Sequence, residues 1–465
     1  MEEELAKKAE VLSKLAGTDW ACGDISASLK HFQEALELYQ KLGDLPNVAM
    51  MHIWMGRVFS SAPLGLADEL KALKHAEAAL AILEPGPDTP QKGLIYQMTA
   101  HLHLHQDEPA TSIVWAQKAV GIFEKLGMFM GTSLGTAQAR TGELDEGIEY
   151  QENNWEPTVR SGNALAIGIC GHEIILSHTL ARNISRALEW EKTALPEITR
   201  ISPQWDATSL NWVLALTYTL SGGASKATEA RRVIESSESK AALIGSGGSF
   251  EESASFGFLY FRQGDWDKAG EVLQGTLSAH EDRHNPVAVN ACSFVLGSLN
   301  LELGDYPKAE ELLLKSLEIC QKGGNVIFEL WVLPVLAELY LMMGKPDKAA
   351  EYVGRGFELL KPDKNWYGLP APMYLAKGML AKTRQDWGTA AESFDKAIQI
   401  NRQYQLPWDE AKALYERGLM YLSRGRKVDR EKAHDGLDEA LAIFQKVGAK
   451  KDVEKVLRKK ERLGA

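Results

Sequence analysis

The six residues Gly-Asp-Tyr-Pro-Lys-Ala at 304–309 decide the fold, because close copies of them recur along the chain. The copies are Gly-Asp-Trp-Asp-Lys-Ala at 264–269, Gly-Lys-Pro-Asp-Lys-Ala at 344–349 and Gln-Asp-Trp-Gly-Thr-Ala at 385–390, with spacings of 40, 40 and 41 residues. A fixed period of this length is typical of stacked helical repeats, whose units cannot bury their apolar faces alone. The sequence therefore predicts one continuous array that presents a long binding surface.

A small residue lies seven positions before most of the turns. Gly257, Gly297, Ala337, Gly378 and Gly418 hold this position. A larger side chain there would hold the two helices of a unit apart, so these residues mark the points where the paired helices cross.

A second recurring segment predicts where the second helix of a unit ends. It reads Tyr-Gln-Lys-Leu-Gly at 39–43, Phe-Glu-Lys-Leu-Gly at 123–127, Cys-Gln-Lys-Gly-Gly at 320–324 and Phe-Gln-Lys-Val-Gly at 444–448. The lysine favours the negative end of the helix dipole, and the glycine supplies a left-handed cap. Together the two signals predict hairpin turns near residues 23, 63, 107, 142, 182, 222, 264, 304, 344, 385 and 425.

The combination of Gly378, Asp386-Trp387, Ala390, Phe394 and Ala397 resembles the tetratricopeptide repeat. That repeat has a usual length of about 34 residues, shorter than the spacing found here. The resemblance covers nearly the whole chain. It implies an all-α fold, a right-handed superhelical solenoid of about eleven antiparallel helix pairs that spans residues 1–465 as a single domain.

The end of the chain is basic, with seven lysines and arginines between residues 450 and 462. Val453, Val456, Leu457 and Leu463 alternate with them at helical spacing. We therefore expect an amphipathic capping helix at about 451–463, because a terminal repeat needs a polar outer face. An anion-binding tail is the alternative.

The longer unit, with its Phe-x-Lys-x-Gly helix end, resembles the helical C-terminal regions of bacterial signalling ATPases, nucleotide cyclases and maltose-type transcription activators. In those proteins the array senses or docks while other domains perform the chemistry. The resemblance therefore implies a role in bacterial signal transduction.

Composition restricts the class of partner and the compartment. The net charge is -11, from 52 basic and 63 acidic residues, which would repel a phosphate backbone and argues against direct nucleic-acid binding. The charged start at residues 1–10 is no secretory signal, and no apolar run approaches the length needed to cross a bilayer. The four cysteines are far apart, which suggests neither disulfides nor a zinc site. A cytoplasmic protein without membrane contact is expected.

Motifs for catalysis or cofactor binding do not emerge from the sequence. The chain has no phosphate-binding loop, and the glycine cluster at 245–248 is best interpreted as a loop between repeats. Of His101, His103 and His105, only the first and last share a helix face, and a pair is too few for a metal site. We therefore expect no catalytic residue, no cofactor and no metal, and a protein that is not an enzyme.

The tetratricopeptide resemblance also singles out a groove. In such arrays the first helix of each unit lines the concave side, and the positions three before and one after the crossing residue face the ligand. In this chain those positions hold Arg57, His101, His172, Trp212, Phe258, Phe294 and Glu338. Large aromatic side chains on an exposed inner wall would form an interaction site. The alternative is that a tightly wound array buries them against neighbouring helices.

The function expected from these features is a non-catalytic scaffold or sensor that binds a protein, a peptide or a small effector in its concave groove. The alternative is that the chain is the regulatory region of a larger ATPase or of an adenylate or guanylate cyclase, with the catalytic domains elsewhere.

Overall fold

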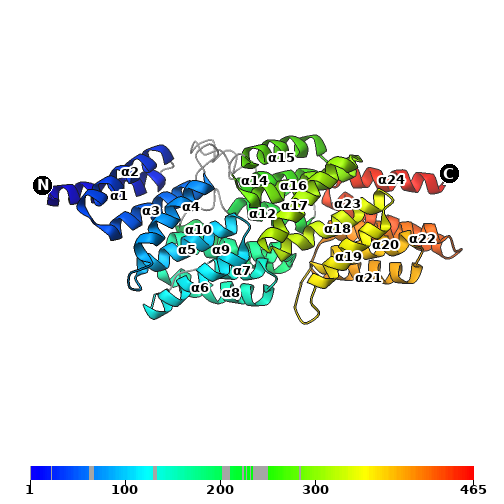
Figure 1. Cartoon of the computed structure of the whole chain (residues 1–465). Helices are drawn as coiled ribbons and strands as arrows, with labels where there is room; N and C mark the ends of the chain where they lie inside the picture. The colour runs from blue at the N-terminus through cyan, green and yellow to red at the C-terminus, as the bar shows by residue number, and fades with distance from the viewer. Residues whose placement is uncertain are drawn as a thin grey trace.

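The fold is an all-α repeat array, with its two ends at opposite extremes of the molecule (Figure 1). This computed structural model describes residues 2–21, 24–61, 68–128, 133–201, 210–222, 225–226, 228–230, 232–233, 250–281 and 284–464. Within these ranges the chain forms helices and loops and no strand. The turn residue Gly23, the turn near residue 63 and the glycine cluster at 245–248 lie outside the described residues.

The helices of the first half of the array are α1 (Glu2–Ala21), α2 (Ile25–Leu42), α3 (Leu45–Ser61), α4 (Glu69–Leu83), α5 (Pro90–His105), α6 (Pro109–Lys125), α7 (Leu134–Arg140), α8 (Leu144–Ser161), α9 (Ala164–Leu180), α10 (Ile184–Ile201) and α12 (Leu210–Ser221).

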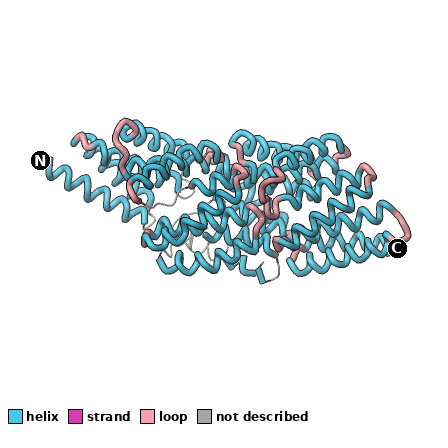
Figure 2. Tube along the Cα trace, turned by 90° about the horizontal axis from the view of Figure 1, so that it is seen from below, coloured by secondary structure: helices cyan, strands magenta, loops and turns pink. Residues whose placement is uncertain are grey.

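The helices of the second half are α14 (Phe250–Gln263), α15 (Trp266–Glu281), α16 (Pro286–Leu303), α17 (Tyr306–Gly323), α18 (Val326–Met342), α19 (Pro346–Leu359), α20 (Pro370–Thr383), α21 (Trp387–Gln403), α22 (Pro407–Arg424), α23 (Asp429–Val447) and α24 (Lys450–Gly464). Figure 2 shows the helices of the array lying side by side, joined by loops at their ends.

The recurring Gly-Asp segment forms the turn inside a helix pair. Gly304 ends α16 in the left-handed conformation with φ 81°, and the side chain of Asp305 accepts a hydrogen bond from the backbone N–H of Lys308 to cap α17. Asp386 caps α21 in the same way, on the N–H of Thr389. The segment is therefore a helix end and a helix start joined directly.

The crossing positions allow close helix packing, as the sequence predicts. A Cβ atom added to Gly297 would lie 2.7 Å from Cγ of Leu313, and one added to Gly378 would lie 2.6 Å from Cε1 of Phe394. Both partners are fully buried, each on the second helix of its own pair. Neighbouring pairs bury their apolar faces against one another in this way, and the buried side chains form several clusters along the array, with Leu313 in one and Phe394 in the next.

The array winds tightly enough for distant units to touch. We call these contacts the inter-coil seam, defined as the contacts of the hairpin turns in residues 106–182 with residues 284–409. Asp107, in a turn, accepts hydrogen bonds from Asn290 Nδ2 at 2.9 Å and Asn325 Nδ2 at 2.6 Å, from positions 183 and 218 residues away. Gly323 makes room for this turn, because a Cβ there would overlap the carbonyl oxygen of Asp107.

Arg182 forms the central part of the seam. Its NH2 group donates to Asp409 Oδ2 at 2.7 Å, 227 residues away, and its guanidinium lies 5.1 Å from the ring centre of Trp331. Trp331 in turn donates from Nε1 to the carbonyl oxygen of Leu180 at 3.0 Å. The backbone N–H of Gly368 reaches the carbonyl of Ala181 at 3.2 Å.

The loop that follows α19 also crosses the seam. Lys364 pairs with Glu143, and the hydroxyl of Tyr367 donates to Asp145 Oδ1 at 2.7 Å. At the C-terminal end, α24 packs back on earlier units, with Lys455 Nζ 3.3 Å from Glu302 and Trp408 Nε1 3.0 Å from Asp452. The last helix therefore contacts units from earlier in the array.

Helix α16 corrects the expectation that no apolar run of the sequence approaches the length needed to cross a bilayer. Its 18 residues, Pro286–Leu303, are long and apolar enough to cross a membrane by length and composition alone. In the array 67% of this stretch is buried, and its side chains pack against α17 and the neighbouring pairs. Burial on nearly all sides of a core helix accounts for the composition.

Candidate functional site

The row of residues expected to line a groove lies on the first helices of the pairs, and its aromatic members are buried. Trp212 on α12, Phe258 on α14 and Phe294 on α16 are 7%, 3% and 7% exposed. In the structure these rings are therefore packed against neighbouring helices, which is the alternative that the sequence left open. The reason is the winding, which places Trp331 against the rings of Phe258 and Phe294 at 6.4 and 6.0 Å between centres.

Packing leaves two adjoining cavities inside the superhelix. One has a volume of about 90 Å³ and the other about 80 Å³. Phe258, Phe294 and Trp331 line both, so these three rings form the wall between them. Glu338 lines the first cavity and Trp212 the second. Five of the residues named from the sequence therefore lie in or beside one region, since His172 contacts the ring of Trp212 at 5.3 Å between ring centres.

The first cavity, which we call the polar cavity, carries charged groups of both signs. Those lining it are Arg182, Arg262, Glu302, Glu338, Asp409 and Lys412. Lys412 Nζ donates to Glu338 Oε2 at 2.7 Å, and Asp409 is shared between the two guanidinium groups. Burial alone would raise the pKa of Asp409, but the two arginines hold it below its usual value.

Arg262 is incompletely paired in this cavity. Its guanidinium carbon lies 3.5 Å from the ring centre of Trp408 and 4.8 Å from that of Phe258, and NH2 lies 3.5 Å from Asp409 Oδ1. The Nε and NH1 groups are buried and have no hydrogen-bond acceptor among the residues that the structure describes. Burial lowers the pKa of Arg262, which still remains a cation at neutral pH.

The second cavity, which we call the apolar cavity, has Arg140 as the one charged residue among the described side chains that line it. The Arg140 side chain comes from the end of α7 and is 8% exposed. NH1 donates to the carbonyl oxygen of Leu104 at 3.1 Å, while Nε is buried with no acceptor in the described part of the chain.

Comparison with protein families identifies the repeat. The tetratricopeptide repeat model matches residues 252–322 and 290–361. Residues 252–361 carry tetratricopeptide repeats. The matched units contain α14 to α19, and they supply Phe258, Phe294, Trp331 and Glu338 to the two cavities.

Solved structures with similar tetratricopeptide-like arrays have low sequence identity to this chain. A Rap protein complexed with Competence and Sporulation Factor has 14% identity and a TM-score of 0.48, over 87% of this chain and 99% of that one. A chain of the APC/C hetero-tetramer Cut9-Hcn1 has 12% identity and a TM-score of 0.43, over 98% of each chain. BtubC from P. vanneervenii has 21% identity and a TM-score of 0.31, over 47% of this chain and 86% of that one. No curated protein sequence matches the chain significantly.

Two members of the predicted row lie elsewhere in the helical array. Arg57 on α3 stacks on the rings of Trp20 and Trp54, with its guanidinium carbon 5.9 and 5.8 Å from their centres, and burial lowers its pKa to about 10. His101 on α5 contacts His105 one helical turn later, with ring centres 4.4 Å apart. Neither lines the two cavities. In the described residues no group of three or more His, Cys, Asp or Glu side chains is arranged to hold a metal ion.

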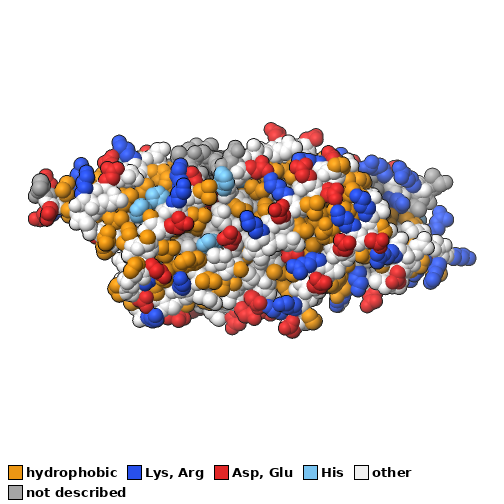
Figure 3. Space-filling view, viewed as in Figure 1, with side chains coloured by type: hydrophobic (Ala, Val, Ile, Leu, Met, Phe, Trp, Pro, Cys, Tyr) orange, Lys and Arg blue, Asp and Glu red, His pale blue; other side chains and the backbone are white. Residues whose placement is uncertain are grey.

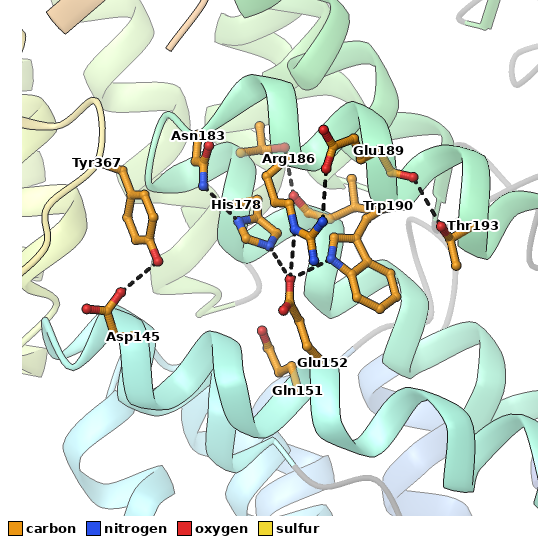
Figure 4. Close-up of polar contacts among 12 residues, drawn as sticks. Asp145, Gln151, Glu152, His178, Asn183, Arg186, Glu189, Trp190, Thr193 and Tyr367 are labelled. Atoms are coloured by element: carbon orange, nitrogen blue, oxygen red, sulfur yellow. Dashed lines mark hydrogen bonds and ion pairs between the residues drawn. The ribbon is translucent and has the colours of Figure 1, made fainter. Parts of the chain in front are cut away.

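A polar cluster occupies an open hollow beside the seam (Figure 4). Glu152 Oε1 accepts hydrogen bonds from His178 Nε2 at 3.0 Å, Arg186 Nε at 3.2 Å and Trp190 Nε1 at 2.6 Å. Burial alone would raise the pKa of Glu152, but these donors lower it to about 2. One carboxylate oxygen therefore holds three neighbouring side chains in place.

Sequence reasoning missed several residues that line the cavities. Arg262 and Trp331 could have been found, because Arg262 lies one helical turn after Phe258 and Trp331 lies two turns before Glu338, along the same inner face. Extending the predicted row by one turn on α14 and by two turns on α18 would have included them. Arg182, Arg140 and Asp409 had no such signal, because the first two lie at hairpin turns and the third belongs to a distant unit.

Proposed function

We propose that this chain is a non-catalytic scaffold that binds a peptide segment of a partner protein at the polar cavity, in bacterial signal transduction in the cytoplasm. A tetratricopeptide array is consistent with a protein-interaction role. The single observation that carries the proposal is Arg262, which lines a cavity together with aromatic rings and whose buried Nε and NH1 groups have no acceptor among the described residues.

The chemistry of this wall suits a peptide. A buried donor without an acceptor costs about 1–3 kcal/mol, so a ligand that brings acceptor oxygens is favoured there. A peptide main chain brings one carbonyl oxygen per residue, and one of its apolar side chains would lie against Phe258 and Trp331. The cavity of about 90 Å³ accepts a single side chain and not a folded domain.

The outer surface supports a protein partner more than a nucleic acid. On the face in Figure 3, basic and acidic side chains are interspersed between apolar ones. The net charge of -11 adds a general repulsion of phosphate groups. Direct nucleic-acid binding and membrane contact are therefore not part of the proposal.

The alternative, a regulatory region of a larger ATPase or nucleotide cyclase, uses the same surface. The two proposals differ in what the gene product contains, and its full-length sequence separates them. In both proposals this chain binds a partner and does not catalyse a reaction.

The test is selection of peptides from a random display library on the purified chain, followed by affinity measurement. We expect Arg262→Gln to weaken the selected peptides at least 10-fold, because it removes the cation and its free donors. Arg384→Gln is the matched control, since Arg384 lies on the surface with 47% of its side chain exposed. Thermal melts of both variants establish that they are folded. Peptides that bind wild type and Arg262→Gln equally would contradict the proposal.

A further inference from the structure

The apolar cavity is separate from the proposed peptide site in its chemistry. Its lining is aromatic and aliphatic, including Trp212, Leu216, Phe258 and Phe294. Arg140 stands at its wall with a buried Nε group that has no acceptor within the described residues. An apolar enclosure with one cation is suited to a ligand that has an apolar body and one anionic group.

The charges around Arg140 limit the ligand to a single negative charge. Two acidic side chains, Asp107 and Glu173, interact electrostatically with Arg140. Asp107 is already hydrogen bonded to Asn290 and Asn325 across the seam, and burial raises the pKa of Glu173 to about 7. A ligand with two charges would leave one of them unpaired among apolar rings, at a cost of several kcal/mol.

The volume limits the size of the apolar body. A dry cavity of about 150 Å³ binds benzene, and the apolar cavity has about half of that volume. The body is therefore smaller than a phenyl ring, on the order of three or four carbon atoms. A phosphate or a sugar would leave the rings of Trp212 and Phe294 against polar atoms.

We propose that the apolar cavity binds a small aliphatic monocarboxylic acid, with the carboxylate on Arg140 and the alkyl chain among Trp212, Phe258 and Phe294. The ligand chemistry has two sources, a free acid and the carboxyl terminus of a peptide that ends in an aliphatic residue, and we assign the free acid because a volume of about 80 Å³ holds a few carbon atoms and leaves no room for a peptide main chain beside them. This effector site adds to the peptide site, with which it shares the wall of Phe258, Phe294 and Trp331.

The test is titration of the whole chain with sodium butyrate, followed by tryptophan fluorescence and calorimetry. We expect saturable binding with a dissociation constant below about 1 mM, and at least 10-fold weaker binding of butyramide, which has the same shape without the charge. A short peptide ending in valine is the third probe. The free-acid assignment is overturned if the peptide binds and butyrate does not. It is also overturned if butyrate and butyramide bind with equal affinity, or if none of the three probes binds.

Two variants locate the site. Arg140→Gln removes the cation and is expected to lower butyrate affinity at least 10-fold. Since Arg140 also holds the carbonyl of Leu104, Ala291→Met is the second variant, because it fills the cavity from its wall and leaves Arg140 unchanged. We expect it to abolish binding. Unchanged butyrate affinity in both variants overturns the proposal.

The variant Arg262→Gln separates this proposal from the proposed function. Arg262→Gln is expected to keep butyrate affinity within about twofold while it loses affinity for the selected peptides. Arg140→Gln is expected to lose affinity for butyrate while it keeps affinity for the peptides. The two proposals can therefore be rejected independently, because each variant weakens the binding of only one of the two ligands.

Discussion

The contacts between neighbouring helices and the contacts of the inter-coil seam stabilise the same molecule by different means. Between neighbours the contacts are mainly apolar, as where Phe394 packs under Gly378. Across the seam they are mainly polar, as where Asp107 binds two asparagines and Arg182 binds Asp409. The first kind repeats with the period of the sequence, whereas the second occurs once at each place.

The difference has consequences for stability. A solenoid held only by neighbouring units behaves as a one-dimensional chain, in which each repeat can open by itself. The seam joins residues up to 227 positions apart, so it couples distant repeats. It also supplies part of the wall of the polar cavity, because Arg182, Trp331 and Asp409 belong to the seam and line that cavity as well. Each prediction below separates the two kinds of contact.

The largest effect is expected for Asp409→Ala. This carboxylate pairs with Arg182 and lies near Arg262, and its removal leaves two buried guanidinium groups without their shared partner. Breaking a buried pair by removing one partner costs about 3–5 kcal/mol. We expect that loss in the free energy of unfolding, measured by chemical denaturation. A loss below about 1 kcal/mol would mean that the seam contributes little.

The sequence indicated the neighbour contacts far better than the seam. Gly297 and Gly378 were located as crossing points because their spacing repeats, and Phe258, Phe294 and Glu338 were placed on the inner face by the same register. Asp409 could not be linked to Arg182, because no period connects residues 227 positions apart. The exposure of the inner rings could not be predicted either, since it depends on how tightly the array winds.

A smaller effect is expected for Gly323→Ala, which acts on the seam through shape and not through charge. The added methyl group would overlap the carbonyl oxygen of Asp107, so the turn must move away from α17. Overpacking of this kind costs about 1–3 kcal/mol. We expect a lower melting temperature, and a larger radius of gyration in small-angle X-ray scattering because the coils separate.

Gly354→Ala is the control for that experiment. Gly354 lies inside α19 and has open space around its Cα, so alanine there is expected to stabilise the protein by about 0.5–1 kcal/mol. If both variants shift the melting temperature in the same direction, the steric role of Gly323 in the seam is wrong.

Glu152→Gln tests a polar contact between neighbouring helices. The amide keeps the shape but loses the charge that His178, Arg186 and Trp190 contact, and we expect a loss of about 1–2 kcal/mol at pH 7 after allowance for solvent screening. Because the pKa of Glu152 is lowered to about 2 in the folded protein, its contribution is present above about pH 4.5 and is lost as the pH falls toward 2. Wild type and variant should therefore converge in stability over that range, in denaturation measured as a function of pH. A constant difference would exclude the charge as the cause.

The smallest effect is expected for Asp347→Ala, which removes an exposed ion pair between neighbouring units. Arg384 NH2 lies 2.8 Å from Asp347 Oδ1, nearly the distance of 2.7 Å that joins Arg182 to Asp409. The side chains of the surface pair are 47% and 96% exposed, against 5% and 13% for the seam pair. Exposed pairs contribute at most about 1 kcal/mol, and we expect a change below about 0.5 kcal/mol that disappears in high salt. Two ion pairs of almost equal length would then differ severalfold in effect, and burial in the seam would be the reason. An equal loss in both variants would instead assign the effect to the charge pair itself, wherever it lies in the array.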